Sequence, residues 1–330
     1  MNTETTSGSS RGKNKWLSDL FKTREFNLFI IIAVVFIILA IMRPQVFPTW
    51  KNMEAITNGM VYDLVLAAGM TIALILWGID LSVGSVLALS SVITAMMLRA
   101  GSPIVFAVIV GMLTAAFCGL INGFIIARFK IAPFIVTLAM FSIARGVAVV
   151  LTSGYYLSGL PDAFLTIGRG NIFGLPASLV IVAVVLILLG QLMKRSRFFH
   201  QMYFIGNNPE AALLSGLDVS MAIIVGYILS SSMAGIAAIM MTSRLAMGFS
   251  GFGQLAELRA IAAAVIGGAS FTGGEGSILG ATFGVILLAF INNGFVLLNG
   301  PPDWQQAVSG IILLVAVGVD AYRRRNERKD

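Results

Sequence analysis

The sequence predicts an all-α polytopic membrane protein with about ten transmembrane helices and with both termini in the cytoplasm. Hydrophobic residues make up 58% of the 330 residues and charged residues only 11%, whereas a soluble domain has about 45–50% apolar and about 25% charged residues. So few charges cannot cover a soluble surface, and a disordered chain would be poor in apolar residues. A soluble enzyme and a disordered protein are therefore both excluded.

Apolar segments recur along the whole chain at lengths close to the roughly 20 residues that cross a hydrocarbon core. Their approximate bounds are 27–42, 59–78, 83–99, 103–126, 133–152, 176–193, 220–242, 257–270, 277–298 and 304–321. They are expected to form one transmembrane domain, 27–321, between a polar tail (1–26) and a basic tail (322–330). No small-residue cleavage site follows the first apolar segment, so we expect the first tail to be an uncleaved cytoplasmic segment.

The charges of the connecting loops support this count. With ten spans and a cytoplasmic N-terminus, 15 of the 22 Lys and Arg residues lie in the tails and the inner loops, and six lie outside. Cytoplasmic loops of membrane proteins carry an excess of Lys and Arg. One span more or fewer near the N-terminus would invert the later loops and remove this excess.

The longest predicted inner loop, 194–219, contains a short helical pattern. Asn208 is suited to cap a helix, Pro209 to its first turn and Gly216 to its end. A short helix between two spans has two explanations. It turns the chain, or it forms a surface on which a cytosolic partner acts, and the residues alone do not separate these.

Several polar residues fall in or beside the apolar segments. Asp80 stands in a glycine-interrupted run, where it either lines a water-filled cavity at a broken helix or caps the third helix by accepting from the amide of Ser82 or Val83. The second reading is favoured, because the predicted topology places Asp80 near the cytoplasmic end. Asp63 and Arg145 lie within predicted spans, and each is expected either to face a pathway or to be solvated near a helix end. Three asparagines bond between helices or contact a polar solute, namely Asn122, Asn292 and Asn293.

The sequence contains no motif of a nucleotide site and no set of ligands for a metal site. The glycine cluster at 267–277 is not a Walker A loop, because no Lys-Ser or Lys-Thr pair follows a glycine anywhere in the chain. It is instead expected to connect two short helices tightly. Cys118 and His200 are the single residues of their types, too few for zinc, haem or iron–sulfur ligation. No bound cofactor and no nucleic-acid partner are expected.

Five segments in register resemble the ribose/monosaccharide-type permeases of ABC importers. They span roughly residues 45–320. The first is GIDLSVGS at 78–85, followed by PFIVTL at 133–138 with ARG at 144–146, GNNPEAA at 206–212 with SG at 215–216, AIAA at 260–263, and NNG at 292–294 after the glycine cluster.

This resemblance implies a multi-pass cell-membrane permease that dimerises, receives a monosaccharide or small polyol from an extracytoplasmic binding protein, and is driven by a cytosolic ABC ATPase that holds ATP-Mg. The permease itself would not be an enzyme. The resemblance also implies a structural signature of the family, formed by Gly78, Asp80, Ser82, Gly84, Ser85, Gly273, Gly274 and Gly276. Those implied to couple with the ATPase are Gly206, Asn208, Pro209, Glu210, Ala211, Ala212, Ser215, Gly216 and Leu217.

The sequence also departs from this family pattern. Arg259 stands where the family usually has aspartate, Glu275 where a basic residue is common, and Asp63 where neutral residues are usual. The reversed charges at Arg259 and Glu275 indicate a subfamily or a compensating pair.

The substrate pathway and the outer surface give further candidates. Because sugar sites combine hydrogen bonds with apolar surface, the candidate pathway residues are Asp63, Asn122, Thr137, Phe141 and Asn293. Arg244 and Arg259 are candidates for docking the binding protein, with ordinary headgroup contact as the alternative.

The sequence also leaves two other functions to consider. A gradient-driven secondary transporter would use Asp63 or Asp80 as a proton or sodium site. An integral-membrane enzyme is disfavoured, because no nucleophile–histidine pair or metal cluster is present in the sequence.

Overall fold

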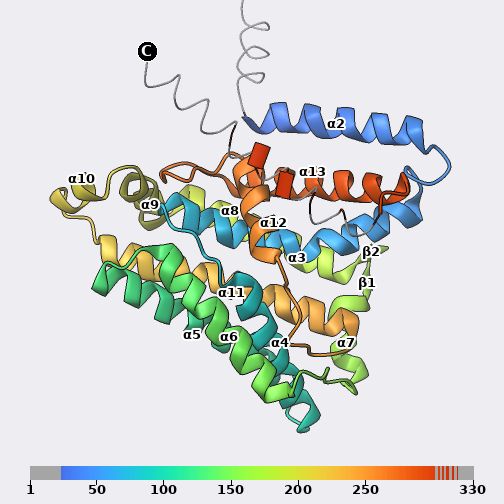
Figure 1. Ribbon diagram of the computed structural model, residues 1–330, viewed down its shortest axis with the longest axis horizontal. Coiled ribbons are helices and arrows are strands. Elements are labelled where there is room, and N and C mark those ends of the chain that lie inside the picture. Colours follow the sequence, from blue (N-terminus) through green and yellow to red (C-terminus); the bar gives the residue numbers. More distant parts are fainter. Residues whose placement is uncertain are drawn as a thin grey trace, which may run out of the picture.

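The computed structural model describes residues 24–301 and, beyond them, residues 304, 307, 310, 311, 314, 315 and 318. Almost all of its regular structure is helical (Figure 1). The long helices are α2 (Arg24–Met42), α3 (Trp50–Ile75), α4 (Val83–Arg99), α5 (Ile104–Phe129), α6 (Pro133–Thr152), α8 (Ala177–Arg195), α11 (Val219–Leu245) and α13 (Ile278–Leu297). The shorter elements are α7 (Asp162–Arg169), α9 (Arg197–Asn207), α10 (Pro209–Leu214), α12 (Ala256–Ile266), β1 (Asn171–Ile172) and β2 (Leu175–Pro176).

Nine of the ten predicted apolar segments are helical, but fewer of them have membrane-spanning length. Seven helices in the described part of the chain are long and apolar enough to cross a membrane. The segment predicted at 257–270 is an 11-residue helix, α12, and α4 has 17 residues. Glycines at 267 and 268 end α12, which is why it is shorter than the apolar run. The tenth segment, 304–321, and the tails 1–23 and 322–330 lie largely or wholly outside the described residues.

Side-chain caps start several helices, at or before the residues where the apolar runs begin. Thr49 Oγ1 accepts from the amide of Asn52, Asp218 Oδ1 from that of Met221, and Ser277 Oγ from that of Gly280. Each cap satisfies an amide that has no partner within its own helix. The polar residues between the spans therefore set where the helices start.

Helix α11 runs through the middle of the bundle and packs against α3, α4 and α5. Small residues allow this close approach: a Cβ at Gly123 would lie 2.7 Å from Cα of Ile224, and one at Gly69 would lie 2.9 Å from the carbonyl oxygen of Ser230. Such contacts are typical of helices that associate within lipid. The outer faces of α2, α5, α6 and α8 expose large apolar side chains, among them Phe117 and Val150, as lipid contact requires.

The two ends of the bundle are built differently (Figure 1). One end carries α9 and α10. The other carries α7 and the hairpin of β1 and β2, in which Asn171 pairs with Pro176, and a bridge between Leu157 and Gly248. The predicted outer loop, 153–175, thus contains a helix and a strand pair. These loops are ordered by hydrogen bonds, not left as irregular connections.

Candidate functional site

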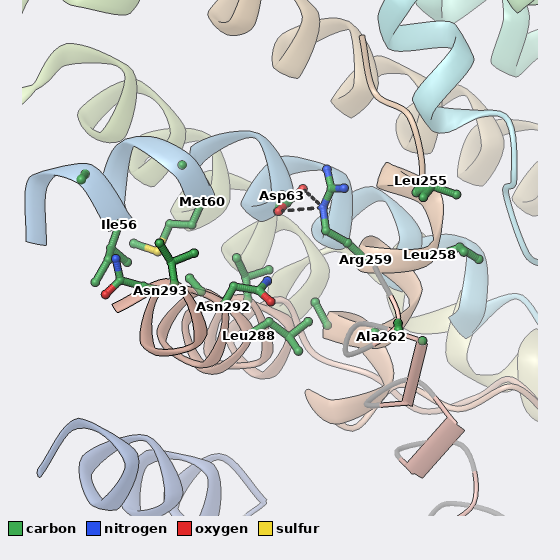
Figure 2. A pocket seen from close by; sticks show the side chains of 18 residues that line it. Ile56, Met60, Asp63, Leu255, Leu258, Arg259, Ala262, Leu288, Asn292 and Asn293 are labelled. Carbon is green, nitrogen blue, oxygen red and sulfur yellow. Dashed lines mark hydrogen bonds and ion pairs between the residues drawn. The ribbon is translucent and has the colours of Figure 1, made fainter. Parts of the chain in front are cut away.

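A pocket of about 1070 Å³ opens between α3, α12 and α13 (Figure 2). Its walls are mostly apolar, with Ile56 and Met60 on α3 and Leu288 on α13. Four polar side chains also line it: Asp63, Arg259, Asn292 and Asn293. An apolar cavity with a few convergent polar groups is the usual form of a small-molecule site.

Asp63 and Arg259 form an ion pair across this pocket. Arg259 Nε lies 3.3 Å from both carboxylate oxygens of Asp63, and the two side chains are 24% (Asp63) and 36% (Arg259) exposed. Arg259 also donates from its NH1 group to the carbonyl oxygen of Gln254 at 3.4 Å. Two of the three departures from the family pattern, Asp63 and Arg259, are thus partners of each other. That Arg259 and Glu275 compensate each other stays a prediction.

Asn293 is held by a second pair, which joins α13 to α3. Asn52 Nδ2 donates to Asn293 Oδ1 at 3.1 Å, and Asn293 Nδ2 donates to Asn52 Oδ1 at 2.9 Å. This reciprocal amide pair ties α13 to α3. Of the alternatives for Asn293, the geometry therefore favours bonding between helices.

The other three predicted pathway residues do not line the pocket. Asn122 is fully buried and donates to Ser82 Oγ at 3.0 Å. The hydroxyl of Thr137 donates to the carbonyl oxygen of Ile79 at 3.0 Å. Phe141 lies under the guanidinium of Arg145, 5.9 Å from ring centroid to Cζ. Conversely, Arg259 and Asn292 line the pocket but are not among the predicted pathway residues. The signal that the sequence offered for them is a polar residue within an apolar segment.

The carboxylate of Asp80 is buried in the break between α3 and α4. Oδ1 accepts from the amide of Ser82 at 3.1 Å and from its hydroxyl at 2.6 Å, and Oδ2 accepts from Ser230 Oγ at 2.8 Å. The predicted bond from the Ser82 amide is present. However, Asp80 is 0% exposed, because α11 covers it; it is not at a solvated helix end. Its hydrogen bonds join the segment between α3 and α4 to α11.

The glycines of the GIDLSVGS segment are sites of close contact. A Cβ at Gly78 would collide with Tyr227 Oη, and one at Gly84 with the carbonyl oxygen of Gly253. Ser85 is buried, and its hydroxyl has no hydrogen-bond partner among the residues described. The segment thus brings α4 against α11 and against the connection that precedes α12.

That connection, residues 246–255, is also fixed by Arg145. Its NH1 group donates to the carbonyl oxygens of Ser250 and Phe252, the latter at 2.6 Å. Arg145 is half-buried on α6 and also interacts electrostatically with Glu257. It neither faces the pocket nor lies free in solvent at a helix end, but holds the loop from which α12 starts.

The glycine cluster joins α12 to α13, as predicted, although α13 is a long helix. Gly273, Gly274 and Gly276 have φ of +84°, +74° and +153°, which residues with a Cβ adopt only with strain. The amide of Gly274 donates to the carbonyl oxygen of Ile75, the last residue of α3, at 2.9 Å. A Cβ at Gly206 of α9 would collide with that same carbonyl oxygen. We call the contact of Ile75, Gly206, Gly273 and Gly274 the glycine junction.

The predicted short helix of the inner loop is α10. Asn208 caps it by accepting from the amide of Ala211 at 2.9 Å, Pro209 is its first residue, and Gly216 follows it with φ of +79°. Leu213 and Leu214 are 66% and 90% exposed. These two leucines form an apolar patch at the end of the bundle, next to Glu210 in the first turn.

The two arginines proposed for docking have contacts within the chain. Arg244, at the end of α11, is partly buried and interacts with Tyr62 of α3. Arg259 faces Asp63 in the pocket. A docking role for either arginine stays a prediction. Within the described residues, no group of three or more His, Cys, Asp or Glu side chains could hold a metal ion.

Comparison with known proteins identifies the chain. Residues 52–317 match the family described as branched-chain amino acid transport system / permease component. The chain belongs to this family. The permease is 36% identical to the ribose import permease of Bacillus subtilis (strain 168), over 88% of this chain and 91% of the relative. It is 35% identical to the L-arabinose transport system permease of Escherichia coli (strain K12), over 99% of both chains. It is 33% identical to the D-allose transport system permease of the same strain, over 90% of this chain and 91% of the relative.

These findings confirm the resemblance that the sequence motifs predict. The permease is a membrane-embedded transport protein and not itself an enzyme. Seven helices in the part of the chain that the structure describes have the length and composition to cross a membrane. No solved structure matches it.

Proposed function

We propose that this permease is the membrane subunit of an ABC importer that carries a monosaccharide or a related small polyol across the cell membrane. The relatives above import ribose, D-allose and L-arabinose, which are all neutral sugars. A cytosolic ATPase would bind ATP-Mg and supply the energy, an extracytoplasmic binding protein would deliver the sugar, and two permease chains would enclose the passage.

The orientation that fits this function places α9 and α10 in the cytosol. The C-terminal ends of α5 and α8, with Arg128, Lys194 and Arg195 in their last turns, lie at the same end as α10. Basic residues accumulate on the cytoplasmic side of membrane proteins. Both chain termini are then cytoplasmic, and the pocket lies toward the opposite side.

In this arrangement α10 is the element on which the ATPase acts. The exposed Leu213 and Leu214 offer an apolar surface patch on which a protein partner can dock. A displacement of α10 would move α9, because the two are consecutive and Asn208 belongs to the end of one and the cap of the other.

The glycine junction is the observation that carries the proposal. It places the last turn of α9 directly against the end of α3 and against the connection that leads into α13. Backbone atoms meet there with no flexible side chains between them, so a shift of α9 is transmitted and not absorbed. Since α3, α12 and α13 form the pocket, ATP-driven movement at α10 would change access to it.

The test is reconstitution of the permease into liposomes with its ATPase and binding protein. We expect uptake of labelled sugar to require ATP and to be lost in Leu214→Asp, which places a charge on the docking patch. Leu214→Ala, which keeps the surface uncharged, should retain more uptake. Uptake that continues without the ATPase and stops with an uncoupler would support the gradient-driven alternative instead.

A further inference from the structure

The pocket combines apolar walls with charged groups that retain hydrogen-bonding capacity. Asp63 offers two carboxylate oxygens, and its contacts with Arg259 Nε, at 3.3 Å, are longer than the 2.7–3.2 Å of a usual N–H···O bond. A carboxylate accepts about four bonds and a guanidinium donates five. The ion pair therefore leaves donors and acceptors available to a ligand, and both side chains remain partly exposed to the pocket.

The charges around the pocket sum to zero. Among the described residues that line it, the charged ones are Asp63 and Arg259, so one carboxylate is balanced by one guanidinium group. An anionic ligand would meet the carboxylate, and a cationic ligand the guanidinium group. The balance favours a ligand without net charge.

Asn292 supplies the third polar group. Asn293 is engaged with Asn52, whereas Asn292 lines the pocket one residue earlier on α13, between Asn293 and Leu288 (Figure 2). An amide both donates and accepts, so it suits a hydroxyl group in either role. The apolar residues nearby, Met60 and Leu288, can cover the carbon face of a ring.

We propose that Asp63, Arg259 and Asn292 are the specificity-determining residues of the passage, and that the Asp63–Arg259 pair opens to bind neighbouring hydroxyl groups of a neutral sugar. One hydroxyl donates to the carboxylate of Asp63, and the adjacent hydroxyl accepts from the guanidinium of Arg259. This inference rests on the proposed function, since it names the contacts that a transported monosaccharide makes.

The ion pair also stabilises the passage when no ligand is bound. A lone charge in a membrane-embedded cavity is costly, but each member of the pair neutralises the other while no sugar is present. Because the bonds are long and the groups partly exposed, sugar hydroxyls can replace them while the carboxylate keeps a donor and the guanidinium keeps an acceptor. Weak binding of this kind suits a passage that must release its substrate.

The experiment compares uptake of D-ribose, D-allose and L-arabinose by the reconstituted importer, all variants being supplied with the same binding protein and ATPase. Any change in the relative rates of the sugars then belongs to the permease. The variants are Asp63→Asn, Arg259→Gln, Asn292→Ala and the charge exchange Asp63→Arg with Arg259→Asp. Glu54→Gln is the matched control, because Glu54 is an exposed carboxylate on the same helix and does not line the pocket.

We expect Asp63→Asn and Arg259→Gln to lower uptake about tenfold or more, as loss of a hydrogen bond to a charged group does, while Glu54→Gln transports normally. ATP hydrolysis by each reconstituted complex shows that assembly is intact. Asn292→Ala removes no charge, so it tests the site even where a charge variant fails to assemble, and it should change the order of the three sugars.

The charge exchange separates a binding role from a purely structural one. If the pair contacts sugar, the exchange changes the relative rates of the three sugars even where it restores uptake. If uptake returns with the original order of sugars, or if Asn292→Ala transports all three as the wild type does, the inference is wrong. If the wild-type complex shows no ATP-dependent uptake of any sugar, the proposed function fails instead.

Discussion

The amide of Gly274 donates a 2.9 Å hydrogen bond to the carbonyl oxygen of Ile75. This bond joins the end of α3 to the connection between α12 and α13, two segments separated by about 200 residues in the sequence. Gly206 of α9 packs against the same carbonyl oxygen. The end of α3, the last turn of α9 and the connection between α12 and α13 therefore meet at one backbone atom.

Gly206→Ala should uncouple ATP hydrolysis from transport. Alanine favours a helix more than glycine does, so α9 itself should not be weakened, but the added Cβ would collide with the carbonyl oxygen of Ile75 and would lie 2.7 Å from the amide nitrogen of Gly274. We expect about a tenfold fall in sugar taken up per ATP hydrolysed, measured in proteoliposomes. Gly146→Ala on α6, where nothing lies within 4 Å of the new Cβ, is the control. Equal coupling ratios in the two variants would contradict the role of the junction.

Asp80→Ala should destabilise the bundle more than Ser230→Ala does. Asp80→Ala removes the acceptor of three hydrogen bonds, so the buried hydroxyls of Ser82 and Ser230 lose the carboxylate to which they donate. Ser230→Ala removes only one donor. We expect losses of about 2–4 kcal/mol and about 1 kcal/mol respectively, read as a lower melting temperature of the purified permease in detergent. Ser142→Ala, an exposed residue bonded only within its own helix at 3.3 Å, should melt as the wild type does. A melting temperature of Asp80→Ala equal to that of the control would contradict the importance of this network.

Asn52 and Asn293 should show an interaction free energy in a double-mutant cycle. Each alanine variant leaves the other amide without its reciprocal partner, so the second substitution should cost less than the first. The expected interaction is about 0.6–1.7 kcal/mol, the range of hydrogen bonds between membrane helices, from the melting temperatures of Asn52→Ala, Asn293→Ala and the double variant. Strictly additive shifts would show that the pair contributes nothing.

Asn208→Ala should weaken α10 without unfolding the bundle. Loss of an N-cap costs about 1 kcal/mol, and here it removes the bond to the amide of Ala211. We expect faster amide hydrogen exchange at residues 211–214 and weaker co-purification of the ATPase. Asn208→Ser keeps a capping oxygen and should retain both properties; if it behaves like the alanine variant, the cap is not the reason for the loss.

The class of the protein can be predicted from its amino-acid sequence alone. Composition and the recurrence of apolar segments are properties of the chain alone, because transfer from water to lipid depends mainly on which side chains a segment carries. The start of α10 was also predictable, since Asn208, Pro209 and Gly216 act on neighbouring backbone groups. The five motifs in register predicted the permease family that the comparisons confirm.

Only the tertiary structure decided which polar residues meet. Asp63 and Arg259 are 196 residues apart, and Asp80 and Ser230 are 150 apart, so no local rule pairs them. The length of α12 likewise depends on Gly267, its C-cap, which packs closely against Gly280 and Ala281 of α13, and not on hydrophobicity. Burial of Asp80 by α11, and the placement of Asn122 and Thr137 outside the pocket, follow from the way whole helices are arranged, because each side chain's surroundings are supplied by segments distant in the sequence.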